Sequence, residues 1–289
     1  MQVVCSSDGV PAVANNKHRS LTMVAKAKDF VAMPGHDVSF FKNNGIGFEG
    51  HIGRVELREN WEEIKPYLAT AHLPYSNQKA LNIASYNDQE READIQYLKD
   101  SIVTAASYGA KQCVMHTCGF ESINEELVGC YERMIDAMKE LAQFAKNYKL
   151  LVCVENMVLR NPKQRYLYGS FATQWYQIYE DVNETNVMLT LDTSHAASSV
   201  QGYKTLEDRQ KHIFDFVAHP ERIAHIHWSD SRIATQEALF LDLHLIPGEG
   251  DLPLEFHRQV KKLEAVRVFE QDKCTDEQVL QAISFVESL

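Results

Sequence analysis

Short apolar runs alternate with longer amphipathic stretches along most of this chain. The runs are rich in Val, Ile and Leu and do not alternate cleanly with polar residues, which is typical of strands buried on both faces. Eight such runs are present, at Val3–Cys5, Ile52–Leu57, Ala69–His72, Gln112–His116, Leu151–Glu155, Val187–Asp192, Ile223–His227 and Val266–Glu270. They predict eight buried strands.

The stretches between the runs carry apolar residues at helical spacing. Helices are predicted at Glu90–Ser107, Asn124–Tyr148, Phe171–Val182, Thr205–Val217 and Thr275–Leu289. Asn124 is followed by two glutamates, an acidic start that suits a helix N-terminus. The first helix, within residues 6–50, is poorly marked.

Strand–helix alternation repeated eight times predicts an α/β fold, a single (β/α)8 TIM barrel. The 289 residues fit one such barrel, and no Pro/Ser-rich linker or charge block marks a boundary, so we expect one domain over residues 1–289. An open doubly wound sheet is the alternative. It lacks support, because no predicted strand is followed by the Gly-x-Gly-x-x-Gly pattern of a dinucleotide site.

Composition and charge limit the partners and the cellular location that we expect. Apolar residues make up 45% of the chain, enough for a full core, and the net charge of −11 does not favour nucleic acid or an anionic membrane as partner. None of the six cysteines forms a Cys-x-x-Cys pair, so free thiols are expected. No secretory signal or run of about 20 apolar residues is apparent. We therefore expect a cytoplasmic protein without a membrane partner, and the sequence leaves open whether it forms a homo-oligomer.

Histidines and acids stand where the predicted strands end, the level at which such barrels carry their chemistry. These residues are His72, His116, Glu155, Asp192, His227 and Glu270, with His195 shortly after Asp192, and Asp242 and His244 in the loop after His227. Each alone can be a hydrogen-bonded structural side chain or a helix cap. Together at one level they are costly unless paired or metal-bound. Imidazole and carboxylate ligands without thiolate predict a divalent metal site for Zn2+, Mn2+, Fe2+ or Co2+.

Five stretches resemble motifs of the xylose isomerase-like TIM-barrel superfamily, which includes sugar-phosphate isomerases and epimerases and also endonuclease IV. The stretches are VCVENM, LTLDTSHA, AHIHWSDS, DLHLIPGEGDLPL and RVFEQD. The resemblance covers nearly the whole chain from about Ile52 onward. It is specific for the superfamily and does not name a substrate.

The sugar epimerases and isomerases of this group hold one metal with two Glu, one Asp and one His. The resemblance implies Glu155, Asp192, His227 and Glu270 for these roles, with the two glutamates also serving as catalytic acid and base. It implies that His195 contacts a substrate hydroxyl. Arg232, in the loop after His227, is expected to bind substrate as well.

Endonuclease IV holds three metals with nine residues, and all nine have counterparts here. They are the six strand-end residues with His195, Asp242 and His244, so one to three ions are expected. Three features depart from that enzyme. Ser194 replaces a cysteine, and the glycine that follows the same motif is not in register. Ser76 replaces the apolar wedge beside the DNA-inserted tyrosine that Tyr75 would match.

Two enzymatic functions therefore stay open. The first is a metal-dependent isomerase or epimerase that acts on a small sugar or sugar phosphate through an enediolate. The alternative is an endonuclease IV-like phosphodiesterase that acts on abasic-site DNA, and only then would nucleic acid be a partner. A barrel that has lost catalysis is a third possibility, which the complete ligand set disfavours.

Overall fold

Eight parallel strands close into a barrel in the computed structural model, which describes residues 30–32, 35–123, 126–159, 165–234, 242–271 and 274–289. The barrel strands are β1 Phe30–Ala32, β2 Gly47–His51, β3 Leu68–His72, β6 Gln112–Met115, β9 Leu151–Glu155, β11 Val187–Asp192, β12 Ile223–His227 and β13 Val266–Val268. The ring is closed because β1 pairs in parallel with both β2 and β13. The predicted (β/α)8 fold is confirmed.

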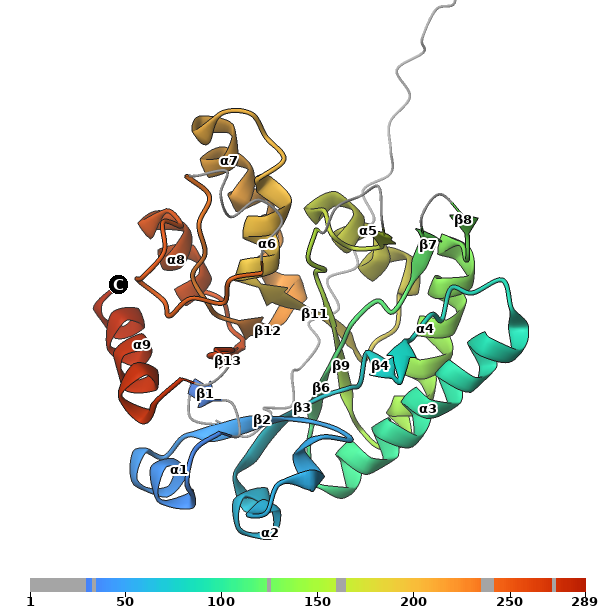
Figure 1. The fold of residues 1–289 in the computed structure, drawn as a ribbon, viewed down its shortest axis with the longest axis horizontal. Coiled ribbons are helices and arrows are strands. Elements are labelled where there is room, and N and C mark those ends of the chain that lie inside the picture. The colour runs from blue at the N-terminus through green and yellow to red at the C-terminus, as the bar shows by residue number, and fades with distance from the viewer. Residues whose placement is uncertain (1–29, 33–34, 124–125, 160–164, 235–241, 272–273) are drawn as a thin grey trace, which may run out of the picture.

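Helices surround the barrel, with α3 and α4 packed side by side on one flank and α9 on another (Figure 1). They are α1 Val38–Asn44, α2 Trp61–Ile64, α3 Asp88–Ser107, α4 Tyr131–Lys146, α5 Ala172–Val182, α6 Thr193–Val200, α7 Leu206–His212, α8 Leu254–Lys261 and α9 Asp276–Ser288. Short 3-10 turns lie at Val55–Leu57, Lys65–Tyr67, Ile213–Val217 and Pro220–Arg222. Within the described ranges, no helix combines the length and apolarity that a membrane span requires.

Two small antiparallel sheets lie outside the barrel ring. One consists of β7 Phe120–Ile123, β8 Glu126–Leu127 and β10 Arg165–Leu167, and the other of β4 Ser76–Asn77 and β5 Lys79–Ala80. They belong to the loops that follow β3, β6 and β9.

The first two predicted strands differ from the structure. Val3–Cys5 lies outside the described residues, and the first barrel strand is Phe30–Ala32. The second strand is β2, so the prediction at Ile52–Leu57 is wrong; that segment forms a turn and a 3-10 helix. Strand β2 reads GFEGH, and its glycines obscure the apolar signal. They are needed because a Cβ at Gly47 would lie 2.7 Å from the Ala69 Cβ on β3.

The predicted helix Asn124–Tyr148 begins too early. Helix α4 starts at Tyr131, because Glu126–Leu127 pairs with β7 in an antiparallel hairpin, while residues 124–125 lie outside the described part of the chain. The acidic start that indicated a helix N-terminus therefore belongs partly to a strand. The last helix is placed as expected, since Thr275 and Gln278 form a capping box at the start of α9.

The barrel interior is unusually polar. Branched apolar side chains normally fill such barrels. Here Glu49, Thr70 and His225 are buried inside, and Glu49 stands beside Thr70 in the β2–β3 register. This polar interior lies directly beneath the residues that the sequence singled out.

Candidate metal centre

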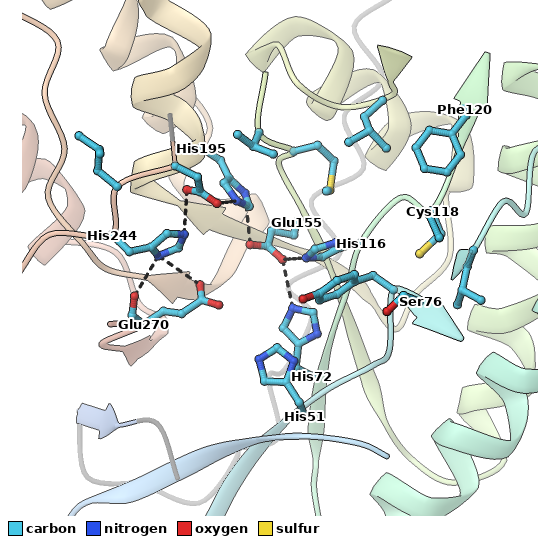
Figure 2. A pocket seen from close by; sticks show the side chains of 18 residues that line it. His51, His72, Ser76, His116, Cys118, Phe120, Glu155, His195, His244 and Glu270 are labelled. Carbon is cyan, nitrogen blue, oxygen red and sulfur yellow. Dashed lines mark hydrogen bonds and ion pairs between the residues drawn. The ribbon is translucent and has the colours of Figure 1, made fainter. Parts of the chain in front are cut away.

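A cavity of about 570 Å3 opens at the carboxyl ends of the strands (Figure 2). Histidines and acids line one side and apolar side chains the other, and no described lining residue is Lys or Arg. The polar lining includes His51, His72, His116, Glu155, His195, Asp242, His244 and Glu270. The structure therefore brings together residues that are spread over more than 200 positions of the chain.

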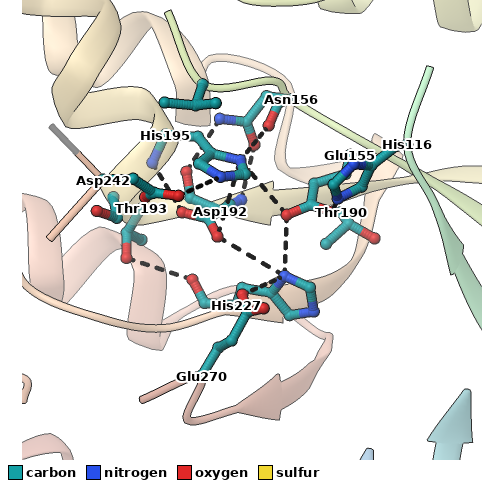
Figure 3. Close-up of polar contacts among 12 residues, drawn as sticks. His116, Glu155, Asn156, Thr190, Asp192, Thr193, His195, His227, Asp242 and Glu270 are labelled. Atoms are coloured by element: carbon teal, nitrogen blue, oxygen red, sulfur yellow. Dashed lines mark hydrogen bonds and ion pairs between the residues drawn. The ribbon is translucent and has the colours of Figure 1, made fainter. Parts of the chain in front are cut away.

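Three carboxylates converge on the Nδ1 atom of His227 (Figure 3). The distances from this nitrogen are 2.8 Å to Glu270 Oε2, 3.0 Å to Glu155 Oε1 and 3.7 Å to Asp192 Oδ2. One ligand atom from each of the four residues lies within 4.8 Å of all the others. Such a cluster can hold a divalent cation with nitrogen and oxygen ligands.

The buried carboxylate oxygens of this cluster give further support for a bound cation. Glu155 Oε2, Asp192 Oδ2 and Glu270 Oε2 are inaccessible, and none accepts a well-directed hydrogen bond within the described residues. Buried polar atoms are nearly always satisfied, and a buried carboxylate without partners is costly. Asp192 Oδ2 and Glu270 Oε2 both face His227 Nδ1, and Glu155 Oε2 faces the neighbouring His116, so these oxygens fit bound cations better than an empty ion-pair network.

A second group consists of His72, His116 and Glu155, and it shares the glutamate with the first. Glu155 Oε2 lies 3.0 Å from His116 Nε2 and 3.4 Å from His72 Nε2. His72 Nδ1 lies 2.7 Å from the carbonyl oxygen of Leu73, so that nitrogen donates and Nε2 is left facing the glutamate. Tyr75 stacks on the His116 ring at 4.7 Å between centroids and fixes its plane.

A third group consists of Asp192, His195 and His244, with Asp242 beside the two histidines. Asp242 lies 2.8 Å from His244 Nε2 and 3.3 Å from His195 Nε2. His244 has a φ of 42°, in the left-handed region that costs a non-glycine residue energy. Ser194 Oγ accepts hydrogen bonds from the backbone N–H groups of Leu243 and His244, which holds this conformation.

Electrostatics keep the two glutamates of the centre ionised, whereas burial raises the pKa of Asp192. Burial alone would raise the pKa of Glu270, but the charges of His227 and His244 outweigh it and lower the pKa to about 2. Glu155 is likewise buried, yet His227 and His116 hold its pKa well below the usual range. The reverse holds for His244, where Asp192 and Glu270 overcome burial and raise the pKa to about 10.

Asp230, a buried acid three residues after β12, holds the loop that carries Asp242 and His244 through its side chain and through a backbone pair with Leu245. Asp230 Oδ1 accepts from the N–H of Ser231 at 2.8 Å and of Leu252 at 3.3 Å, and Oδ2 accepts from the N–H of Gly248 at 3.0 Å. The same carboxylate lies 3.4 Å from His257 Nε2.

Sequence reasoning missed three residues: His51, and Glu49 and His225, which form a fourth such group with His227. Glu49 and His51 lie in the misplaced second strand. His51 stacks on His72 at 4.3 Å, and burial together with the His72 charge lowers its pKa to about 3. His225 precedes His227 by two positions, and that spacing on a strand gave a signal for it.

Arg232, the expected substrate contact, lies outside the cavity. Its side chain is exposed, and it is not among the residues that line the cavity wall. The other residues singled out as ligands are drawn together at the mouth, each in at least one of the three groups or against Asp242.

The fold and the site define a barrel whose strand ends carry imidazole–carboxylate clusters able to hold metal. The chain belongs to the xylose isomerase-like TIM barrel family, whose model matches residues 30–270.

This chain is similar in sequence to one of the following three proteins and in fold to the other two. The uncharacterised protein MJ1614 of Methanocaldococcus jannaschii is 24% identical over 247 residues, 80% of this chain and 82% of that protein. A D-psicose 3-epimerase crystallised in the presence of D-fructose has a TM-score of 0.62 at 16% identity, covering 87% of this chain and 91% of that one. The TTHB071 protein of Thermus thermophilus, soaked with ZnCl2, has a TM-score of 0.61 at 16% identity, covering 90% and 97%. At these identities the solved structures establish the fold alone.

Proposed function

We propose that this chain is a metal-dependent isomerase or epimerase that acts on a small sugar or sugar phosphate. One observation carries the proposal: Glu155 and Glu270, from the fifth and eighth strands of the barrel, both line the cavity and both approach His227 Nδ1. Two ionised carboxylates thus face one small space from different sides. The fold shared with a D-psicose 3-epimerase supports the same function.

The two glutamates would exchange protons with the substrate. Glu155 takes a proton from the carbon beside a carbonyl, which leaves an enediolate. Glu270 is ionised in the free site, so it first takes a proton from a substrate hydroxyl or from water and then returns one to carbon. Return to the same carbon from the opposite face gives an epimer, and return to the neighbouring carbon, with a proton shift between the two oxygens, gives an isomer. Glu155, Asp192, His227 and Glu270 would hold a divalent metal, which would polarise the substrate oxygens and make the carbon more acidic.

Other residues would orient the substrate. Asn156 O lies 2.8 Å from His195 Nδ1, so that nitrogen donates and fixes the ring, while Nε2 faces Asp242 at the cavity. A substrate hydroxyl can take this place beside Nε2. The exposed Arg232 would need a substrate that extends beyond the cavity, so we assign it no step.

Phosphoester hydrolysis is a second candidate, and a specific observation favours it. His72 and His116 both face Glu155 Oε2, and Asp242 joins His195 and His244, so two further ligand groups adjoin the one around His227 Nδ1. Multinuclear sites of this kind suit the displacement at a phosphate. Among the described residues of the cavity wall there is no Lys or Arg.

Deuterium uptake distinguishes the two functions. Metal-loaded protein is incubated in heavy water with ketoses such as tagatose, fructose and xylulose and with their phosphates, and in parallel with an abasic-site DNA duplex. An isomerase or epimerase should exchange the carbon-bound hydrogen of at least one sugar. Metal-dependent nicking of the duplex without exchange in any sugar would reject the first function in favour of the second.

A further inference from the structure

A buried acid on the far side of the His227 ring has no place in the chemistry above. Glu49 lies in β2, is fully buried, and is 2.8 Å from His227 Nε2 through Oε1. The opposite nitrogen of the same ring, Nδ1, faces the three carboxylates of the metal centre. The imidazole therefore stands between Glu49 and the metal centre.

The partners of Glu49 determine its hydrogen-bonding role. Thr70 Oγ1 donates to Oε2 at 2.8 Å, and His225 Nε2 lies 3.0 Å from the same oxygen. Glu49 Oε1, 2.8 Å away, is therefore placed to accept a proton carried on His227 Nε2. A neutral imidazole has one ring proton, and with that proton on Nε2 the lone pair is on Nδ1. This is the tautomer that a cation at the centre needs.

Stability does not account for this acid. Desolvating a carboxylate and its partners commonly offsets the attraction between them, and well-packed apolar residues are often equally stable. Branched apolar residues are also what such barrels normally contain at this depth. A buried Glu at this position therefore requires a role beyond packing.

We infer that Glu49 is a positioning residue of the metal centre: it holds the Nε2–H of His227, fixes the plane and tautomer of the ring, and directs Nδ1 to the cation. Carboxylates behind metal-bound histidines do this in many sites, and their loss typically weakens metal binding by about 10–100-fold. The inference concerns metal binding alone, so it holds for either proposed reaction.

The test uses Glu49→Gln, which keeps the shape and one acceptor oxygen and removes the charge. Zn2+ binding is measured by chelator competition, and bound ions per chain are counted by elemental analysis. The ion in question is the one that His227→Ala loses. Its binding should weaken by about 10-fold or more, with the number of ions at saturation unchanged.

A matched control separates this role from the general effect of losing a buried acid. Asp94 on α3 is also buried, and its carboxylate accepts from the backbone N–H of Asn82 at 2.7 Å, outside the barrel. Asp94→Asn should leave Zn2+ affinity within about twofold. If Glu49→Gln does not fold, Thr70→Val serves instead; it removes one donor to Glu49 and should weaken the same ion by a smaller factor.

A spectroscopic readout reports on the ring itself. In Zn2+-loaded protein with 15N-labelled histidine, the Nε2–H of His227 should appear as a downfield, slowly exchanging proton that moves upfield in Glu49→Gln. Unchanged affinity with an unchanged Nε2–H signal would overturn the inference. A second outcome would overturn it too: Glu49→Gln binds one ion fewer per chain, while the ion that depends on His227 binds with unchanged affinity. Glu49 would then be a direct ligand together with His225 and His227.

Discussion

Removing the carboxylate of Asp230 should loosen the loop that carries two predicted metal ligands. Three backbone N–H groups donate to this carboxylate, from Ser231, Gly248 and Leu252. A hydrogen bond to a charged group contributes about 1.5–3 kcal/mol. At the lower figure, Asp230→Ala should cost about 4–5 kcal/mol, because the shortened side chain satisfies none of the three donors.

Asp230→Asn separates the charge from the shape. Its amide oxygen can replace Oδ1 and keep the bonds from Ser231 and Leu252, but its NH2 group would face the N–H of Gly248. The cost should therefore be about 1.5–3 kcal/mol, the value of one charge-assisted bond. The two variants should differ in stability by about 2 kcal/mol or more, well beyond the error of a matched comparison.

Urea unfolding of metal-free protein measures both costs, and Zn2+ titration measures the effect on the site. Because Asp242 and His244 lie in the fastened loop, Asp230→Ala should also weaken the ion bound through Asp192, His195 and His244. A cost below about 1 kcal/mol for Asp230→Ala, or full Zn2+ binding in a destabilised variant, would refute the reasoning that this acid positions the loop.

Further expectations concern the chemistry, the ligands and the protons of the site. Glu270→Gln should lower turnover by about 10²–10⁴-fold, and equal turnover at equal metal content would rule out Glu270 as an acid–base group. His116→Asn should bind one ion fewer per chain by elemental analysis, and an unchanged count would remove His116 from the ligands. Gly250→Ala should reproduce the Asp230 defect, since its Cβ would overlap Asp230 Oδ1; wild-type unfolding would contradict this. Zn2+ loading at pH 7 should release protons, because carboxylates outweigh burial and raise the pKa of His227 well above its usual value, and metals bind neutral imidazole. Zn2+ affinity should therefore increase as pH rises. Calorimetry in buffers of different ionisation enthalpy measures the protons released, and a release of zero would contradict the prediction.

Much of the barrel could be predicted because its strands are buried on both faces. Continuous apolar runs such as Val187–Asp192 and Ile223–His227 coincide with β11 and β12. A His or acid that ends such a run must lie at the barrel mouth, because parallel strands align their carboxyl ends. The position of these residues at the ends of their strands was therefore enough to predict that they lie close together at the barrel mouth.

The second strand, β2, could not be predicted in this way, and Glu49, the acid beneath the metal centre, was therefore missed as well. A Cβ at Gly47 would lie 2.7 Å from the Ala69 Cβ and 2.9 Å from the Tyr67 carbonyl oxygen, so close packing against β3 demands a residue without apolar signal. Glu49, two positions on, is a charge inside a barrel, which local propensity argues against. Both exceptions come from tertiary contacts with β3 and β12, and no window of sequence contains them.

Anomalous diffraction from crystals of Zn2+-loaded protein tests the central claim most directly. An ion should lie within about 2.0–2.3 Å of ligand atoms from Glu155, Asp192, His227 and Glu270. An anomalous map without a peak among these four residues, with their side chains more than about 5 Å apart, would contradict it.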